Sequence, residues 1–580
     1  MRVGSGTLFL LFVSTSAFAD DSLVSIGDQK YLTESFAGGK ISYLRYPTLG
    51  CPSIVQAGST GTAWIKLGDG GSTSTCVLAV SPNSGVGAAY TLPVLGVAYD
   101  SSVGITKVTY QVPAEVPEDT YDLKLSVPAL SVTDLQYNCF KVVNQESSSY
   151  RFLVISDTHF NTPTGFWSPG NYNTGNYNAY SIIQQMKKEI RSLNPTFVLL
   201  SGDLMFGLDY TYEYNNVWDI WKDAGFPIFM APGNHDAYSC IKDRWLLGIH
   251  SPKRDGLDYW RKYLGPCYYS FEFGGVHFQA VNSADGTPER RDGFLIVIEN
   301  YGGDLLPEQM AWITADLAGV NGQIVPYMHH NPMGGYRENK SFGMTDWVIS
   351  RIVEWITTGN FDDYSQQWNS ESTGKFLLEK YAGQPLVFIG HSHVDAIKTH
   401  NATTYKHVTS AGASTGDYWG YAPVRVENSQ IVEYLYTSDD KYQSIPTGNL
   451  HVKITDKEGE EQAAEIKSGL SKSYDVTIEF VMPIAPSYVA TNGTVTQFSP
   501  IDAQTAKVWV KTATPVAPSI QEPQTSTVSV KTSEVAPVAV AGNVENSTGS
   551  SGGGSGSCGL LGLDALLALG VLFLRRRRER

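Results

Sequence analysis

The chain has 580 residues, of which 42% are apolar, and its formal net charge is −15. This length is sufficient for several domains with buried cores. The excess of acidic residues argues against nucleic acid as an electrostatic partner, but not against a small anionic substrate, because bound metal ions reverse the local field.

The first 19 residues have the features of a secretory signal peptide. Arg2 precedes an apolar run at 8–13, and Ala17-Phe18-Ala19 forms a cleavage motif before Asp20. The run is too short to span a membrane. A buried N-terminal strand is the alternative. We therefore expect an exported protein in the periplasm, at the cell surface or secreted.

The six cysteines of an exported chain indicate disulfides. Cys240 and Cys267 lie close in sequence and could pair. Cys51, Cys76 and Cys139 are three, so at most two of them can pair with each other, and Cys558 lies apart. The sequence leaves the pairing open.

Residues 20–147 are expected to form an Ig-like β-sandwich. Short runs with β-type alternation, separated by turn residues, occur at 62–67, 75–80, 107–112 and 121–127. None of them carries a pattern typical of catalysis. We expect a spacer or a domain that frames the substrate.

Residues 148–440 show a different pattern, in which apolar strands alternate with helices. The predicted strands are 152–155, 197–200, 227–230, 276–281, 324–328 and 385–389. Helices are predicted at 180–192 and at 307–318, the second with Pro307 at its start. This alternation predicts an α/β layered domain.

Polar clusters follow five of these strands. They are Asp157 with His159, Asp203, Asn234-His235-Asp236, His329-His330, and His391 with His393. In layered α/β folds the carboxyl ends of strands share one edge, where ligands bind. Each cluster alone also occurs as an ordinary turn or helix cap, but all five in this order indicate a common site.

The residue types in these clusters predict a binuclear metal centre. Two divalent ions about 3.5–4 Å apart need roughly seven oxygen and nitrogen ligands, with one bridging carboxylate. Mixed carboxylate and imidazole ligands favour manganese, iron or zinc. The predicted ligands are Asp157, His159, Asp203, Asn234, one of His329 and His330, His391 and His393. His235 remains beside Asn234, placed to act on a leaving group.

The order Asp-x-His, Gly-Asp, Gly-Asn-His-Asp, His-His and Gly-His-x-His resembles that of the calcineurin-like metallophosphoesterases. The resemblance covers about half of the chain. It implies a four-layer sandwich, two mixed β-sheets flanked by helices, with a two-metal centre that hydrolyses phosphate esters.

The resemblance also implies a role for each residue. Asp157, His159 and His393 would bind the first metal, and Asp203 would bridge the two ions. Asn234, His391 and His329 would bind the second metal, with His330 as the alternative to His329. His235 matches the catalytic histidine, assisted by Asp236, and would act as an imidazolium on the leaving group while metal-activated hydroxide attacks phosphorus.

One subfamily is disfavoured by a single position. Purple acid phosphatases carry a metal-bound tyrosine three residues after the Gly-Asp aspartate, and this chain has Phe206 there. A tyrosinate–iron centre is therefore not expected.

Three segments follow the catalytic region. Residues 441–512 are predicted to form a small β domain, and residues 513–557, rich in Pro, Thr, Ser and Gly, a disordered linker. Residues 558–580 combine a short apolar stretch with an Arg cluster at 575–578. This tail resembles bacterial GlyGly-CTERM and MYXO-CTERM sorting signals, which implies transient membrane insertion and processing by a sorting protease. A permanent transmembrane anchor is the alternative.

Three functions are consistent with these features. The first is an exported phosphoesterase acting on a small phosphorylated substrate. The second is a phosphodiesterase or pyrophosphatase of the same fold that acts on nucleotides or lipid head groups. The third is a non-catalytic surface adhesin, which the complete ligand set argues against.

Overall fold

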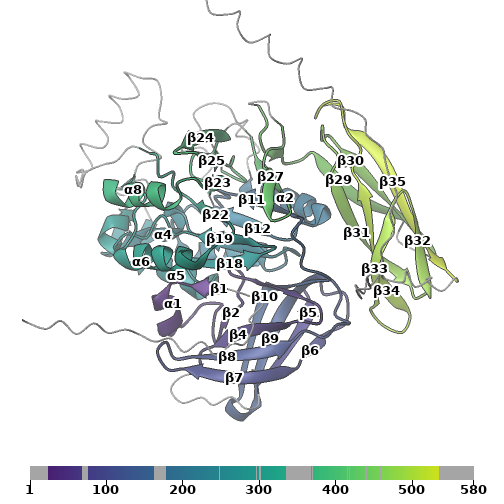
Figure 1. The fold of residues 1–580 in the computed structure, drawn as a ribbon, viewed down its shortest axis with the longest axis horizontal. Coiled ribbons are helices and arrows are strands. Elements are labelled where there is room, and N and C mark those ends of the chain that lie inside the picture. The colour runs from purple at the N-terminus through teal and green to yellow at the C-terminus, as the bar shows by residue number, and fades with distance from the viewer. Residues whose placement is uncertain are drawn as a thin grey trace, which may run out of the picture. The chain divides into compact units, whose positions relative to one another are not determined.

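The computed structural model describes residues 24–67, 76–161, 178–246, 249–294, 297–298, 302–334, 368, 370–413, 416, 418–437, 441–456 and 459–534. Within these residues, strands of an N-terminal β domain are followed by a mixed α/β domain and then by a second set of β-strands (Figure 1).

The N-terminal region contains two sheets around an apolar core that includes Leu78, Leu123 and Phe140. One sheet has the order β3 (Ser53–Gln56), β10 (Val132–Val143), β9 (Asp119–Val127), β5 (Val77–Pro82) and β6 (Tyr90–Leu92). The other has the order β2 (Leu44–Tyr46), β4 (Thr60–Ile65), β8 (Ile105–Gln111) and β7 (Val94–Asp100). Two sheets are thus present, while the Ig-like topology stays a prediction.

The mixed α/β domain is built on two further sheets. The first has the order β1 (Val24–Ile26), β18 (Tyr269–Phe273), β19 (Val276–Ala280), β22 (Gln323–Met328), β23 (Leu386–Ile389), β25 (Thr403–His407) and β24 (Ala396–His400). The second has the order β13 (Ile228–Ala231), β12 (Val198–Ser201), β11 (Tyr150–Ile155), β26 (Gly420–Glu427) and β27 (Gln430–Glu433), and β28 (Ile445–Pro446) pairs with β26.

A phenylalanine-rich core joins side chains from both of these sheets. Phe152 and Phe197 of the second sheet region stack at a ring distance of 5.1 Å, and Phe278 of the first sheet meets Phe152 edge-on at 5.4 Å. The sheet interiors are buried on both faces, which explains the unbroken apolar runs in the sequence. The mixed α/β class is confirmed, and the four-layer sandwich stays a prediction.

Among the described residues of this domain, the α-helices are α2 (Ala179–Leu193), α3 (Tyr210–Trp221), α4 (Asn234–Ala237), α5 (Gly256–Tyr263), α6 (Pro307–Asp316) and α8 (Glu371–Lys380), and α1 (Gln29–Thr33) precedes them. Asn178 caps α2 through Ser181 N, and Asn194 ends it in the left-handed conformation. The helix expected at 307–318 is α6 followed by the 3-10 turn Leu317–Gly319.

Two strand pairings cross the domain boundaries expected from the sequence, which themselves stay a prediction. Residues Val24–Ile26 pair with Tyr269–Phe271, so the chain contributes a strand to the α/β domain before it enters the N-terminal sandwich. The partner of such a short strand lies far away in the sequence, and local composition does not reveal which strand it pairs with.

The C-terminal β domain extends beyond residue 512. One of its sheets has the order β29 (Leu450–Asp456), β30 (Glu461–Ser468), β35 (Gln524–Ser533) and β32 (Ser487–Thr491). The other has the order β31 (Asp475–Pro483), β34 (Thr505–Ala513) and β33 (Thr494–Pro500). Strand β35 pairs with both β30 and β32, although we expected a disordered linker from residue 513. Its Thr, Ser and Val residues suit a strand as well as a linker.

Cys240 and Cys267, for which a pairing was left open, form no disulfide among the described residues. Both residues carry thiols, as do Cys51, Cys76 and Cys139. Cys267 is fully buried, and burial raises the pKa of its thiol well above the usual value. These cysteines act as small apolar core residues.

The predicted signal peptide at 1–19, the sorting tail at 558–580 and the remainder of the expected linker lie outside the described residues. Among the described helices, none has the length and apolar character needed to cross a membrane.

Candidate metal centre

The predicted ligands follow five strands that belong to two different sheets. Strands β11, β12 and β13 run parallel in one sheet and lead to Asp157, Asp203 and Asn234. Strands β22 and β23 run parallel in the other and lead to His329 and His391. We expected one shared edge, but the site gathers the carboxyl ends of strands from both sheets.

The ligand segments share an unusual backbone conformation. Asp157, His159, Asp203, His391 and His393 have φ angles of 55°, 43°, 56°, 69° and 59°. Residues with a side chain adopt this left-handed region rarely, at a cost of order 1–3 kcal/mol each. Such strain concentrated on the predicted ligands is typical of a functional site.

Asp203 lies at the middle of the cluster. Its Oδ2 atom is 3.1 Å from His329 Nε2, 3.4 Å from His159 Nε2 and 4.0 Å from His235 Nε2. The Oδ1 atom accepts a hydrogen bond from the backbone N–H of His235 at 2.9 Å. One carboxylate oxygen thus faces imidazoles from both halves of the site, as a bridging ligand must.

On one side of Asp203 lie Asp157, His159 and His393. Asp157 Oδ1 is 3.2 Å from His393 Nε2 and 3.7 Å from His159 Nε2. The two Nε2 atoms of His159 and His393 face each other at 3.1 Å. These three side chains form one group whose ligand atoms can reach a single ion.

On the other side lie His329, His391 and Asn234. His329 donates from Nδ1 to the Ser201 carbonyl at 2.8 Å, which leaves its Nε2 atom as the acceptor, 3.0 Å from His391 Nδ1. Asn234 Nδ2 donates to the Tyr238 hydroxyl at 2.6 Å, and its Oδ1 atom remains as an acceptor.

His330 lies beside this group and not in it. Its Nδ1 atom pairs with the Ser283 hydroxyl at 2.8 Å, and the same hydroxyl accepts from the His330 N–H. The structure therefore places His329 of the two among the candidate ligands.

The donor set fits divalent metal ions. Two buried oxygen atoms of candidate ligands make no hydrogen bond, namely Asp157 Oδ1 and Asn234 Oδ1. Buried polar atoms without partners are costly, so acceptor atoms in this state indicate a cation that satisfies them. The pairs of facing imidazole nitrogens also require a proton or a cation between them.

The electrostatics of the site favour cations. Burial acts to raise the pKa of Asp203, but His329 and His235 hold that pKa well below its usual range. Burial acts to lower the pKa of His159, but Asp157 and Asp203 raise it to about 10. In the metal-free site the carboxylates are ionised and attract positive charge, whether protons or metal ions.

His235 is held as a neutral imidazole. Burial lowers the pKa of His235 to about 4, and its Nδ1 atom lies 2.7 Å from the Phe206 carbonyl. The N–H therefore stands on Nδ1, and Nε2 faces the site as an acceptor. Phe206, which occupies the position of the purple acid phosphatase tyrosine, thus contributes its backbone and not a ligand.

Asp236 fixes the backbone of the site. Its carboxylate accepts hydrogen bonds from the backbone N–H groups of Asp203, Leu204 and Gly233, at 2.8–2.9 Å. It makes no hydrogen bond to the His235 imidazole among the described residues. Its position indicates that it shapes the ligand loops instead of assisting His235 directly.

Some contributors could not be recognised from the sequence. Tyr238, which orients Asn234, stands in no recognisable motif. Gly233 offers a signal, because a Cβ atom there would lie 2.2 Å from Asp203 Oδ1, so the position requires glycine. This contact explains the Gly before Asn-His-Asp, and it is visible only in the fold.

Comparisons with known proteins agree with this site. Residues 150–395 match the family model of calcineurin-like phosphoesterases. A probable cyclic nucleotide phosphodiesterase of Fibrobacter succinogenes is 25% identical over 211 residues, which cover 36% of this chain and 62% of that protein, less than two thirds of its length. The serine/threonine-protein phosphatase CPPED1 of Pongo abelii is 23% identical over 308 residues, which cover 50% of this chain and 84% of that protein.

Among solved structures, purple acid phosphatase PPD1 from yellow lupin (Lupinus luteus) seeds aligns with a TM-score of 0.38 and 15% identity, covering 67% of this chain and 72% of that one. The family match includes every strand end described above. The similarity to the calcineurin-like phosphoesterase family thus extends over residues 150–395, the part of the chain that carries the candidate ligands.

Proposed function

We propose that this protein is an exported phosphoric ester hydrolase with a binuclear metal centre. The observation that carries the proposal is the position of Asp203 Oδ2 between His329 Nε2 at 3.1 Å and His159 Nε2 at 3.4 Å, with a second carboxylate and two further imidazoles around it. Export rests on the signal-type sequence at 1–19 alone.

In this proposal, Asp157, His159 and His393 hold one ion, Asn234, His329 and His391 hold the other, and Asp203 bridges them. When bound, two divalent ions of manganese, iron or zinc would lower the pKa of a water molecule and polarise the phosphoryl group. The left-handed loops hold the ligands in place before substrate arrives, so no reorganisation is needed during the reaction.

His235 acts on the departing oxygen. Its Nδ1–H is engaged by the Phe206 carbonyl, so Nε2 is the atom that faces the substrate. Because this atom is bare in the neutral imidazole, His235 Nε2 first takes up a proton from the solvent, donates that proton to the leaving group, and returns to the neutral form. The sequence led us to expect that His235 is an imidazolium at rest, but burial and the other histidines disfavour that charged form.

The test is hydrolysis of a panel containing an aryl phosphate monoester, an aryl diester, nucleotides and pyrophosphate, with manganese, zinc or iron added in turn. We expect metal-dependent hydrolysis that chelation abolishes and re-addition restores. Rates that do not change on chelation, or purified protein that binds no stoichiometric transition metal, would contradict the proposal.

A diesterase activity is the second candidate. It is supported by the similarity to a protein named as a cyclic nucleotide phosphodiesterase. A diester-to-monoester rate ratio above one in the same panel would favour it.

A further inference from the structure

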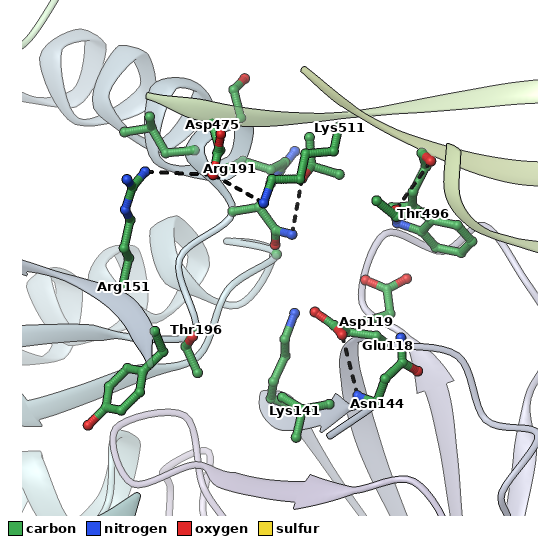
Figure 2. Close-up of a pocket in the computed structure, with 18 of the residues that line it drawn as sticks. Glu118, Asp119, Lys141, Asn144, Arg151, Arg191, Thr196, Asp475, Thr496 and Lys511 are labelled. Atoms are coloured by element: carbon green, nitrogen blue, oxygen red, sulfur yellow. Dashed lines mark hydrogen bonds and ion pairs between the residues drawn. The ribbon is translucent and has the colours of Figure 1, made fainter. Parts of the chain in front are cut away.

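A second polar pocket lies away from the metal centre, within residues 24–534. Its volume is about 870 Å³, and it is lined by segments of the N-terminal sandwich, the α/β domain and the C-terminal β domain (Figure 2). None of the metal-centre residues lines it. The pocket is therefore a separate candidate for ligand binding.

Lys141 is the most unusual residue of this pocket. It lies on β10, where Phe140 and Val142 on either side point into the sandwich core, so Lys141 points to the opposite face of the sheet. Its side chain extends into the pocket and no interaction is drawn to it (Figure 2). The residue is only 4% exposed, and its ammonium group has no hydrogen bond or ion pair among the described residues.

The other charges of the lining are largely paired. Asp475 pairs with Lys511 at 3.1 Å and with Arg151 at 3.9 Å. Asp119 pairs with Lys507 at 2.8 Å, and Lys507 also pairs with Glu479 at 2.9 Å. These ion pairs neutralise most of the carboxylates that would otherwise repel an anion or hold Lys141.

Two groups remain that could compensate Lys141 at a distance. Glu118 Oε2 accepts from the Asn144 N–H at 3.3 Å, and the C-terminal end of α2 carries a partial negative charge. Arg191 in the last turn of α2 offsets that charge, and its own guanidinium is engaged by the Ala224 and Asp223 carbonyls. Neither group contacts the Lys141 ammonium.

We propose that this pocket binds a small oxyanion, a phosphate or carboxylate compound, with Lys141 as its anchor. The Lys141 side chain is largely buried and its ammonium group faces the pocket without a counter-charge, so a bound anion would gain charge-assisted hydrogen bonds there. Thr196, which also lines the pocket, offers a hydroxyl group to such a ligand (Figure 2). The site is independent of the hydrolytic function proposed above.

The experiment counts phosphate ions bound to the full-length, metal-loaded protein by isothermal titration calorimetry at constant ionic strength. The Lys141→Met variant should bind one phosphate fewer than the wild type, because methionine keeps most of the side-chain volume without the charge. The matched control is Lys188→Met, since Lys188 lines the same pocket but is exposed. Its phosphate affinity should change by less than about threefold, as expected for an exposed charge.

A second measurement separates binding from folding. Without phosphate, Lys141→Met should be at least as stable to heat as the wild type, because it removes an unpaired charge and keeps most of the apolar volume of a largely buried side chain. Phosphate should raise the melting temperature of the wild type more than that of the variant. Equal phosphate stoichiometry in both proteins, or a destabilised variant with an unchanged phosphate response, would overturn the proposal. Lys141 would then be a structural residue that interacts with the partial negative charge at the C-terminal end of α2. Hydrolysis of phosphate esters should be unchanged in Lys141→Met.

Discussion

The ligand loops of the α/β domain and the N-terminal sandwich differ in the surroundings of a buried carboxylate. In the sandwich, the buried Asp134 carboxylate accepts hydrogen bonds from the Tyr43 and Leu44 N–H groups, both at 2.7 Å. In the ligand loops, Asp157 Oδ1 and Asn234 Oδ1 are buried without a hydrogen bond. The first arrangement stabilises the fold, and the second leaves acceptor atoms available for a ligand.

Backbone conformation follows the same division. The five left-handed residues at the metal centre are aspartates and histidines with candidate ligand roles. Apart from glycines, the left-handed residues of the described sandwich are Ser131 and Asn138, which lie at a turn and at a register shift between β9 and β10. Strain that a turn would explain is ordinary, whereas strain on five converging polar side chains indicates function.

The largest expected effect comes from exchanging the bridging carboxylate. Asp203→Asn removes the negative charge that faces His159 and His329, so we expect loss of bound metal and a fall in activity of at least about a thousandfold. Elemental analysis and steady-state kinetics measure both.

The comparison with Asp134→Ala in the sandwich sharpens this test. That change leaves two buried N–H groups without an acceptor, so stability should fall by about 1–3 kcal/mol while activity per folded molecule is retained. An Asp203→Asn protein that keeps its metal and activity would contradict the ligand role of Asp203.

The next effect is that of His235. His235→Ala should lower kcat by about a hundredfold to ten-thousandfold, the usual contribution of an acid–base group, with metal content unchanged. The loss should shrink for substrates with good leaving groups such as nitrophenol, since these need no proton. A loss of the same size for aryl and alkyl phosphates would argue that His235 has another role.

A smaller effect is expected from Gly233→Ala. The added methyl group would lie 2.2 Å from Asp203 Oδ1, so the carboxylate must shift, and we expect activity to fall by about tenfold to a hundredfold. Gly319→Ala is the matched control, because nothing lies within 4 Å of its added methyl group. Similar activities of the two variants would mean that the bridging position tolerates displacement.

The smallest effect concerns stability and pH. His277 on β19 lies between Glu272 and Asp316, at 2.5 Å and 3.0 Å. Burial acts to lower the pKa of His277, but Asp316 and Glu272 raise it to about 9 from 6.5.

Because the pKa of His277 is raised in the folded protein, the stabilisation is fully present below about pH 6.5 and is lost as the pH rises through 9. The contribution is roughly 3 kcal/mol at most. Denaturant unfolding at pH 6 and pH 10 measures it, and a His277→Gln variant should lack this part of the pH dependence. The same pH dependence in both proteins would contradict the assignment.

Much of the site could be predicted because its ligands follow directly after apolar strands. Runs such as 152–155 and 385–389 identify buried strands by local composition, and a polar cluster at each strand end is a local pattern too. The register of β1 with β18 and the strand β35 depend on partners far away in the sequence, so local composition did not predict them.

By itself, the sequence determined the family resemblance, the order of the motifs and the types of candidate ligand, because these depend on residue identity and short spacing. Only the tertiary structure decided which member of the His329–His330 pair joins the cluster, since both follow β22 and only His329 points toward Asp203. It also decided that Asp236 binds backbone N–H groups, that Tyr238 orients Asn234, and that Lys141 is buried without a partner. These are relations between segments distant in sequence, which packing alone brings together.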